Sequence, residues 1–422
     1  MSEYSQVIGL GIGWLLVGWV SVQGLIFGWR LLRRHARWRR EYARQRAEFC
    51  QRVEAAARVA RAAKSIADWT GWRAFRVAAI VDEASDVKSF YFVPVDGRPL
   101  SPFAPGQYLT FRLPLPGSEA PIVRCYSLSD RPRQDYYRAT VKRIGPPAGR
   151  LELSPGRGSG FFHDGVRVGD LLDVRAPAGT FLIDPLAGEP IVLIGAGIGI
   201  TPLVSMLESI VHAGRPREVC ALFGFRNGDE HPFKERLARL AEAYPQLHLQ
   251  VSYSAPRDTD VPYKDYHHRG RMTIDRIREV LPSNNFQFYV CGPGGLMEPL
   301  VPALWAWGVP ESDVHYEAFG PASVKRTSAA RSRGHLAAPC EVRFARSNRD
   351  LMWHESFGSL LEFGEAAGIA MPSGCRAGSC GECMMAVRSG TTTLLKEPGI
   401  PVPAGYSLTC ISVPDGAMVL DA

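Results

Sequence analysis

Four cysteines near the C-terminus constrain this chain of 422 residues more than any other feature. Three of them share one short segment, Cys375-Arg-Ala-Gly-Ser-Cys380-Gly-Glu-Cys383, and Cys410 follows at a distance. This C-x4-C-x2-C spacing with a distant fourth cysteine is typical of a [2Fe–2S] cluster held by four thiolates. The small residues between the cysteines let backbone N–H groups turn toward the sulfur atoms. Zinc sites usually have two short cysteine pairs instead, so we predict iron–sulfur ligation by Cys375, Cys380, Cys383 and Cys410.

Length and composition limit the number of domains and the class of protein. A chain of this length suggests about two to four domains, and 46% apolar with 22% charged residues suits a globular protein. The net charge is +7, but much of the arginine lies in one early block, so we expect no nucleic-acid partner. The other five cysteines are scattered and odd in number, which indicates a reducing compartment.

The N-terminus carries an apolar run. Residues 7–29 are 23 consecutive residues without a charge, enough to cross a bilayer as a helix. Basic residues follow this run rather than precede it, which argues against a cleaved signal peptide and, by the positive-inside rule, places the later residues in the cytoplasm. We therefore expect residues 1–29 to be a transmembrane anchor of a single-pass protein of the inner (cytoplasmic) membrane. Residues 30–70 are predicted to form a basic helical stalk, either near anionic headgroups or simply solvated.

Three folded regions are expected after the stalk. Residues 71–185 contain short β-rich runs broken by Gly and Pro, which predicts an antiparallel barrel with strands at 77–81, 87–93, 108–113, 139–142 and 171–174. In residues 186–324 strands alternate with helices, which implies a parallel sheet with strands at 191–194, 219–225, 247–253 and 287–291 and helices at 203–212, 233–244 and 272–281. A polar, basic linker at 325–338 leads to a cluster domain at 339–422, with a strand at 340–344 and a helix at 359–367.

A glycine-rich turn opens the second region. The buried strand 191–194 is followed by Gly195-Ala-Gly197-Ile-Gly199-Ile-Thr201-Pro202 and then a helix. This order is typical of a nucleotide-binding βαβ unit, in which glycines let the backbone approach a pyrophosphate and the helix N-terminus favours its negative charge. Arg226 follows the second strand of this region, and Ser254 with Arg257 follows the third. A 2′-phosphate needs such cations and hydroxyls, but exposed arginines near a ribose are also common in NADH enzymes. These residues leave the choice between NADH and NADPH open.

The barrel region carries Arg124-Cys-Tyr126-Ser127. An arginine can neutralise a pyrophosphate, a tyrosine can lie against an isoalloxazine ring, and a hydroxyl can bond to a ring edge. Downstream, Val141-Lys142-Arg143 and the Gly156–His163 segment with Ser159 stand at plausible phosphate positions. Tyr126 as a core aromatic and Ser159 as a turn hydroxyl remain alternatives.

Taken together, these motifs resemble the ferredoxin–NADP reductase superfamily. Thr201-Pro202 closes the glycine-rich turn as in that superfamily, Cys291-Gly292-Pro293 resembles its second nucleotide motif, and Tyr316-Glu317-Ala-Phe319 resembles its closing segment near the flavin. The order flavin, nucleotide, ferredoxin is similar to that of reductases serving Rieske oxygenases and related hydroxylases.

The resemblance implies a flavin barrel, an α/β nucleotide domain and a β-grasp ferredoxin domain. FAD is favoured by the Gly156–His163 segment, and FMN is the alternative. The resemblance to this superfamily also implies residue roles. The flavin is held by Arg124, Tyr126 and Ser127, with Val141, Lys142, Arg143 and Ser159 at its phosphates. NADH or NADPH is bound by Gly195, Gly197, Gly199, Thr201, Pro202, Arg226, Ser254, Gly292 and Pro293, and the reacting rings meet near Tyr126, Ser127, Cys291 and Phe319.

The implied function is that of a membrane-anchored NAD(P)H-dependent reductase. Electrons pass from NAD(P)H through flavin and [2Fe–2S] to a protein acceptor of oxygenase, hydroxylase or desaturase type, which we expect to be membrane-associated. One alternative is a subunit like that of the sodium-pumping NADH:quinone reductase, although there the ferredoxin domain precedes the flavin domain. Another is a redox sensor or interaction module without turnover.

Overall fold

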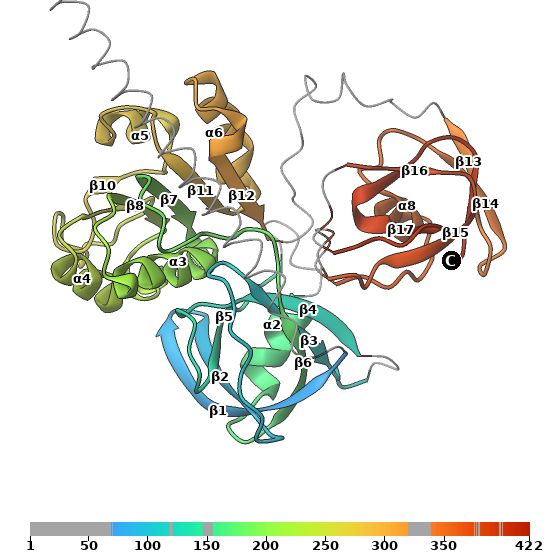
Figure 1. The fold of residues 1–422 in the computed structure, drawn as a ribbon, viewed down its shortest axis with the longest axis horizontal. Coiled ribbons are helices and arrows are strands. Elements are labelled where there is room, and N and C mark those ends of the chain that lie inside the picture. Colours follow the sequence, from blue (N-terminus) through green and yellow to red (C-terminus); the bar gives the residue numbers. More distant parts are fainter. Residues whose placement is uncertain are drawn as a thin grey trace, which may run out of the picture. The chain divides into compact units, whose positions relative to one another are not determined.

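The computed structural model describes residues 69, 71–117, 121–146, 155–319, 339–374, 376, 378, 380–395, 398 and 400–422 (Figure 1). The predicted anchor at 1–29, almost all of the predicted stalk and the predicted linker at 325–338 lie outside these residues. Within the described part of the chain, no helix has both the length and the apolar character needed to cross a membrane. The transmembrane component of the predicted fold class is therefore not found.

The first folded region is a six-stranded antiparallel sheet with the strand order β4-β3-β6-β1-β2-β5. An isolated bridge between Leu128, just after β4, and Ala139 of β5 links the two outer strands, so the sheet curls toward a barrel. Its strands are β1 (Arg73–Ala84), β2 (Val87–Pro94), β3 (Tyr108–Leu113), β4 (Ile122–Ser127), β5 (Tyr137–Lys142) and β6 (Leu171–Ala178). A short helix α2 (Arg157–Gly160) and a π-helical turn η1 (Phe161–Gly165) lie between β5 and β6.

Alternation of side chains explains why this sheet closes on itself. The first half of β1 alternates buried and exposed residues, as expected for a strand with one face in a core. Its buried residues Phe75 and Val77 pack with Phe92, Phe111 and Phe162 in one aromatic core. Because Phe162 belongs to η1, the helical insertion fills the interior of the barrel, and the predicted antiparallel barrel is confirmed.

The second region is a parallel sheet with the order β10-β9-β8-β7-β11-β12. Its strands are β7 (Ile191–Ala196), β8 (Val219–Phe225), β9 (Leu247–Tyr253), β10 (His268–Arg269), β11 (Gln287–Gly292) and β12 (Val314–Ala318). The helical segments are η2 (Gly197–Gly199), α3 (Ile200–Ala213), η3 (Gly228–Glu230), α4 (Lys234–Ala243), α5 (Ile274–Val280), α6 (Gly294–Ala306) and η4 (Glu311–Asp313). The predicted α/β sheet is confirmed.

Both faces of this sheet are covered, as parallel sheets require. Along β7, Leu193 packs with residues of α3 and α4, whereas Val192 and Ile194 pack with residues of α5 and α6. Figure 1 shows the two helix pairs on opposite sides of the strands. Buried on both faces, β7 has the continuous apolar run from which the sequence analysis identifies it.

The third region is a five-stranded sheet with the order β14-β13-β19-β15-β17, in which only the β13–β19 pair is parallel. Its elements are β13 (Cys340–Phe344), β14 (Arg349–Trp353), α8 (Leu360–Ala366), β15 (Met384–Ser389), β17 (Tyr406–Leu408), η5 (Thr409–Ile411) and β19 (Met418–Leu420). A separate two-stranded sheet pairs β16 (Thr392–Leu394) with β18 (Ser412–Pro414). Leu360, Leu361 and Phe363 of α8 pack on Trp353 and Phe344, so a mixed sheet and one helix share a single core.

Candidate functional site

The topology of the parallel sheet locates a nucleotide crevice. From β7 the chain moves outward through β8, β9 and β10, and then returns to the other side of β7 with β11. The order therefore reverses between β7 and β11. In open α/β sheets, ligands bind outside the carboxyl ends of the strands at such a switch point. Here those ends carry the glycine-rich turn and Cys291-Gly292-Pro293.

Close backbone approach explains the glycines at the switch point. A Cβ atom on Gly199 would lie 2.4 Å from the carbonyl oxygen of Cys291, and one on Gly292 would lie 2.9 Å from Leu296. Gly197 has a φ of +54°, which favours glycine. Thr201 donates its hydroxyl to the carbonyl of Ile198 at 2.9 Å and so secures the turn that precedes α3. The structure thus brings Gly195, Gly197, Gly199, Thr201 and Pro202 to one edge of the sheet with Gly292 and Pro293.

Cys291 lies at the centre of this edge. It pairs with Gly195 of β7 on one side and with Glu317 of β12 on the other. Its side chain is fully buried, and this burial, with the Glu317 carboxylate beside it, raises the pKa of the Cys291 thiol well above its ordinary value. Phe319, just beyond β12, packs against the same core as Cys291. The two predicted residues are therefore close together, and the thiol is held in its neutral form.

The two predicted ribose contacts follow neighbouring strands. Arg226 follows β8, and Ser254 follows β9. The amide of Ser254 donates to the carbonyl of Phe225 at 2.9 Å, so the ends of the two strands stay in register. Both residues lie at the carboxyl edge of the sheet, on the β8–β9 side of the switch point.

The barrel motif lies on β4, where Arg124, Tyr126 and Ser127 follow one another. The Tyr126 ring contacts Phe162 edge-on at 4.9 Å between centroids, and burial raises its pKa well above the usual value for tyrosine. A Cβ on Gly158 of α2 would come within 2.9 Å of Arg124 and 3.0 Å of the Tyr126 hydroxyl. The glycines of the Gly156–Gly160 segment therefore let α2 approach the motif closely.

The predicted phosphate residues are engaged with protein groups in this structure. The Ser159 hydroxyl accepts from the amide of Ile144 at 3.1 Å and donates to the carbonyl of Gly156 at 3.0 Å. The carbonyl of Val141 lies 2.9 Å from His163 Nε2. Lys142 pairs with Glu230 at 2.9 Å, and Arg143 pairs with Asp164 at 2.6 Å. Ser159 thus has the turn role that the sequence left as an alternative.

The cluster loop has an unusual backbone. Arg376, Gly378 and Gly381 have φ values of +54°, +75° and +78°. Left-handed residues help to turn backbone N–H groups into one concavity, a feature of many iron–sulfur sites. A Cβ on Gly378 would lie 2.4 Å from Ile411, next to Cys410, so glycine also permits close packing of the loop against η5.

The cysteines themselves fit thiolate ligation. Cys383 Sγ and Cys410 Sγ are 3.1 Å apart, and the Thr409 hydroxyl and amide both donate to the carbonyl of Cys383 at 3.0 and 3.1 Å. A Cβ on Gly374 would come within 2.8 Å of Cys380 Sγ. Cys375 lies outside the described residues, and among those described no three His, Cys, Asp or Glu side chains come together as a metal site.

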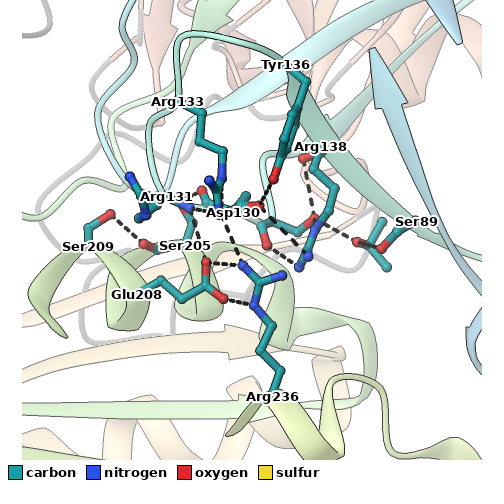
Figure 2. Close-up of polar contacts among 12 residues, drawn as sticks. Ser89, Asp130, Arg131, Arg133, Tyr136, Arg138, Ser205, Glu208, Ser209 and Arg236 are labelled. Carbon is teal, nitrogen blue, oxygen red and sulfur yellow. Dashed lines mark hydrogen bonds and ion pairs between the residues drawn. The ribbon is translucent and has the colours of Figure 1, made fainter. Parts of the chain in front are cut away.

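A buried polar network that the sequence analysis missed joins the barrel to the parallel sheet (Figure 2). Arg236 of α4 binds both oxygens of Glu208 on α3, one of them at 2.6 Å, and also Asp130, just beyond β4, at 3.1 Å. The Ser205 hydroxyl donates to the carbonyl of Asp130 at 2.7 Å, and Tyr136 donates to its carboxylate at 3.0 Å. We call Asp130, Ser205, Glu208 and Arg236 the junction network.

The pKa values of the two carboxyls of the junction network are shifted in opposite directions. Burial opposes ionisation of Asp130, but its contacts with Glu208, Arg138 and Arg236 outweigh burial and lower its pKa. For Glu208 burial prevails over the Arg236 contact and raises the pKa. The helix that follows the glycine-rich turn is therefore tied to the barrel by one anionic carboxylate and one carboxyl that takes up a proton more readily.

Two protein-family models match the chain. The "oxidoreductase NAD-binding domain" model matches residues 193–301, and the "2Fe-2S iron-sulfur cluster binding domain" model matches residues 355–415. The chain is an oxidoreductase with a nicotinamide domain and a C-terminal iron–sulfur domain. The predicted resemblance to the ferredoxin–NADP reductase superfamily is confirmed, as are the predictions of a nicotinamide nucleotide and a [2Fe–2S] cluster.

Individual relatives agree with the matches to the two family models. A flavohemoprotein of Halalkalibacterium halodurans is 38% identical over 261 residues, which are 61% of this chain and 63% of that protein. The flavohem-like FAD/NAD-binding domain of nitric oxide dioxygenase from Vibrio cholerae is 34% identical, with a TM-score of 0.52, over 59% of this chain and 99% of that one. Phthalate dioxygenase reductase is 26% identical, with a TM-score of 0.52, over 83% of this chain and 98% of that one. The chain thus spans less than two thirds of the flavohemoprotein but nearly all of the reductase.

The predicted localisation as a single-pass protein of the inner (cytoplasmic) membrane is wrong. It depended on the uncharged run of residues 7–29 and on the basic residues that follow it, all of which lie outside the described residues. The relatives share the reductase region and are flavohemoproteins, and no described helix is able to span a membrane. An uncharged run is necessary for a membrane anchor, but by its length alone it is not sufficient evidence of one.

Proposed function

We propose that this protein is an electron-transfer reductase that takes a hydride from NADH or NADPH onto FAD and delivers electrons singly through a [2Fe–2S] cluster to a protein acceptor. The observation that carries the proposal is the packing of the Gly197–Gly199 turn on Cys291-Gly292 at the switch point of the parallel sheet, in one chain with the barrel and the cluster loop. When bound, the flavin accepts a hydride and the cluster carries one electron at a time.

The residues of the chain bind and orient the flavin and the nicotinamide, and they exclude water. We assign the flavin to Arg124, Tyr126 and Ser127, because a half-buried cation and a fixed aromatic ring suit its phosphates and its ring system. The nicotinamide ring is assigned to the surroundings of Cys291 and Phe319. A neutral thiol there brings no charge to compete with hydride transfer, so its contribution is to align the ring and to exclude water.

FAD is preferred to FMN because the Vibrio FAD/NAD-binding domain is more similar in sequence than phthalate dioxygenase reductase. The acceptor is proposed to be an oxygenase-type protein. The support is phthalate dioxygenase reductase, which is named for a dioxygenase, described as transferring electrons from pyridine nucleotides to [2Fe–2S], and matched over nearly its whole length.

The test is anaerobic reduction of the full chain carrying flavin and cluster. We expect NADH or NADPH to bleach the flavin absorbance and to produce the electron paramagnetic resonance signal of a reduced [2Fe–2S] cluster. The Cys383→Ser variant is the matched control, because it removes one ligand of the cluster and leaves the flavin site intact. It should keep flavin bleaching and lose the resonance signal. No bleaching with either nucleotide would refute the proposed function.

A further inference from the structure

The carboxyl edge of the parallel sheet carries a compact charged corner on the β8–β9 side. It comprises Arg226, Asp229 and Glu230 after β8, and Arg257 and Asp260 after β9; we call it the ribose corner. In doubly wound sheets the adenosine ribose lies at the end of the strand that follows the glycine-rich βα unit, where an acidic residue binds the 2′-hydroxyl or an arginine binds a 2′-phosphate. In this chain that strand is β8, so the charges of the ribose corner decide which nucleotide fits.

Arg257 is held firmly by two carboxylates. Its guanidinium contacts Asp260 at 3.1 Å and also binds Asp229. The Asp260 carboxylate further accepts the backbone amide of Arg257 at 2.8 Å and that of Gly228 at 3.3 Å. The Asp260 side chain is only 3% exposed. Removing the guanidinium would therefore leave a buried carboxylate without its counter-charge, which is costly.

Asp260 also fixes the backbone of the corner. A Cβ on Gly228 would lie 2.5 Å from its carboxylate oxygen, so the chain passes very close to the charge. The next turn is capped by the Asn227 side chain, which accepts the amides of Asp229 and Glu230. The loops after β8 and β9 are thus joined through one buried carboxylate, and the positions of Asp229 and Glu230 are well defined.

The other cations are already paired as well. Arg226 lies 3.7 Å from Glu230, and Glu230 also pairs with Lys142 at 2.9 Å. With Lys142 included, the corner holds three cations and three carboxylates, and each cation already has a carboxylate partner. Burial opposes ionisation of Asp260, yet its hydrogen bonds with Arg257 and Gly228 outweigh burial and keep its pKa below the usual value. Asp260 therefore keeps its negative charge despite its burial.

We propose that the ribose corner selects NADH and rejects NADPH. The inference rests on the proposed function and names its electron donor. A ribose diol can donate a hydrogen bond to Asp229 or Glu230, which are partly exposed, and leaves every ion pair intact. A 2′-phosphate brings about two negative charges toward three carboxylates and has to take Arg257 or Arg226 away from its partner.

The first experiment compares kcat/KM for NADH and NADPH in the full chain, with ferricyanide as acceptor. Since like-charge juxtaposition strongly suppresses the wrong ligand, we expect NADH to be preferred on the order of 100-fold. Equal use of both nucleotides would overturn the inference while leaving the proposed function intact. Absence of turnover with both would instead refute the proposed function.

Variants that remove the charge of a side chain but keep its shape test the role of each carboxylate. Asp229→Asn and Glu230→Gln each remove one negative charge. Asp229→Asn loosens Arg257, which keeps its contact with Asp260, and Glu230→Gln frees Arg226 from its carboxylate partner. Each should therefore raise kcat/KM for NADPH roughly tenfold relative to NADH. Asp258→Asn is the matched control, because Asp258 is exposed in the same loop and forms no ion pair with any residue of the described part of the chain. It should leave the ratio unchanged. If the three variants behave alike, the ribose corner does not discriminate.

A binding measurement makes the test independent of hydride transfer. Calorimetric titration of the oxidised protein with 5′-AMP and with 2′,5′-ADP probes the adenosine end alone. We expect 5′-AMP to bind more tightly than 2′,5′-ADP in the unchanged protein, and the difference to shrink in Asp229→Asn. Tighter binding of 2′,5′-ADP to the unchanged protein would contradict the inference whatever the kinetics.

Discussion

Gly199 is the residue at which the nucleotide crevice tolerates least change. Its φ is an ordinary −61°, so the backbone itself would accept alanine. The obstacle is the Cys291 carbonyl, 2.4 Å from where a Cβ would stand. Gly199→Ala should therefore push the turn away from β11, lower the stability by about 1–3 kcal/mol and weaken NADH binding.

The measurement is urea unfolding together with titration of NADH. Gly188→Ala serves as control, because a Cβ there meets nothing within 4 Å and its φ is not in the left-handed region. Unchanged stability and unchanged NADH affinity in Gly199→Ala would show that the turn can move without consequence.

His231 carries a pH dependence of stability. It stacks on Phe225 at 4.1 Å between ring centroids, and its Nδ1 lies 2.8 Å from the Tyr253 hydroxyl. Burial lowers its pKa from 6.5 to about 3. The unfolded chain therefore takes up the proton first as the pH falls. The contribution of neutral His231 to stability is complete above pH 6.5 and is lost progressively between 6.5 and about 3.

Between about pH 7 and about pH 5.5, this linkage should cost about 1 kcal/mol of unfolding free energy. His231→Asn should remove that part of the pH dependence, as measured by urea unfolding at both pH values. His248→Asn, at an exposed histidine of β9, should keep it. A pH slope unchanged by His231→Asn would mean that other groups account for it.

At the scale of elements, the cluster loop depends on glycine for two separable reasons. Gly378 and Gly405 have similar φ values, +75° and +78°, so alanine at either position incurs a similar backbone strain of about 1 kcal/mol. Only at Gly378 would a Cβ also collide, at 2.4 Å, with Ile411 beside Cys410. We expect Gly378→Ala to lose bound iron and sulfide and Gly405→Ala to retain them, as measured by metal and sulfide analysis of the purified proteins. Equal cluster content in both would show that strain alone matters.

Elements were predictable from sequence where the pattern is local. The strands 219–225, 247–253 and 340–344 have the predicted limits. The first is an apolar run between charged residues, and the third alternates apolar with charged side chains. Helix α6 was not predicted. Pro299 and Pro302 lie inside it and remove hydrogen bonds that a helix normally makes, yet Leu300, Val301 and Leu304 are buried against the sheet. Tertiary packing there outweighs local propensity.

Site residues, too, were predictable where the sequence pattern is local. The glycines, Cys291 and the barrel motif were identified because they stand in short, ordered motifs. The junction network was not, since Asp130 and Arg236 are 106 positions apart and neither belongs to a motif. The partners of Lys142 and Arg143 in the structure, Glu230 and Asp164, were likewise not predicted, because they share no sequence motif with them. The contact of the two cations with flavin phosphates stays a prediction.

At the scale of the whole molecule, the barrel and the nucleotide sheet contact through charge at the junction network as well as at the Lys142–Glu230 pair. Arg236 is the only member that touches both Glu208 and Asp130, so its loss would leave two facing carboxyls without the cation between them. Hydride transfer needs the two rings aligned, and a displacement of about 1 Å can slow such a step about 100-fold. Arg236→Met should therefore slow NADH-dependent bleaching of the flavin about 10- to 100-fold. The affinity for 5′-AMP should stay the same, because the adenosine end lies within the nucleotide sheet.

Stopped-flow reduction of the flavin under anaerobic conditions, at saturating NADH, measures this rate directly. Arg239→Met on the exposed side of α4 is the matched control and should behave as the unchanged protein. Arg236→Lys should recover part of the rate, since it keeps the charge but not the two-pronged contact with Glu208. A bleaching rate unaffected by Arg236→Met would show that alignment of the rings does not depend on the junction network. A parallel loss of 5′-AMP affinity would show instead that the variant had disturbed the nucleotide sheet itself.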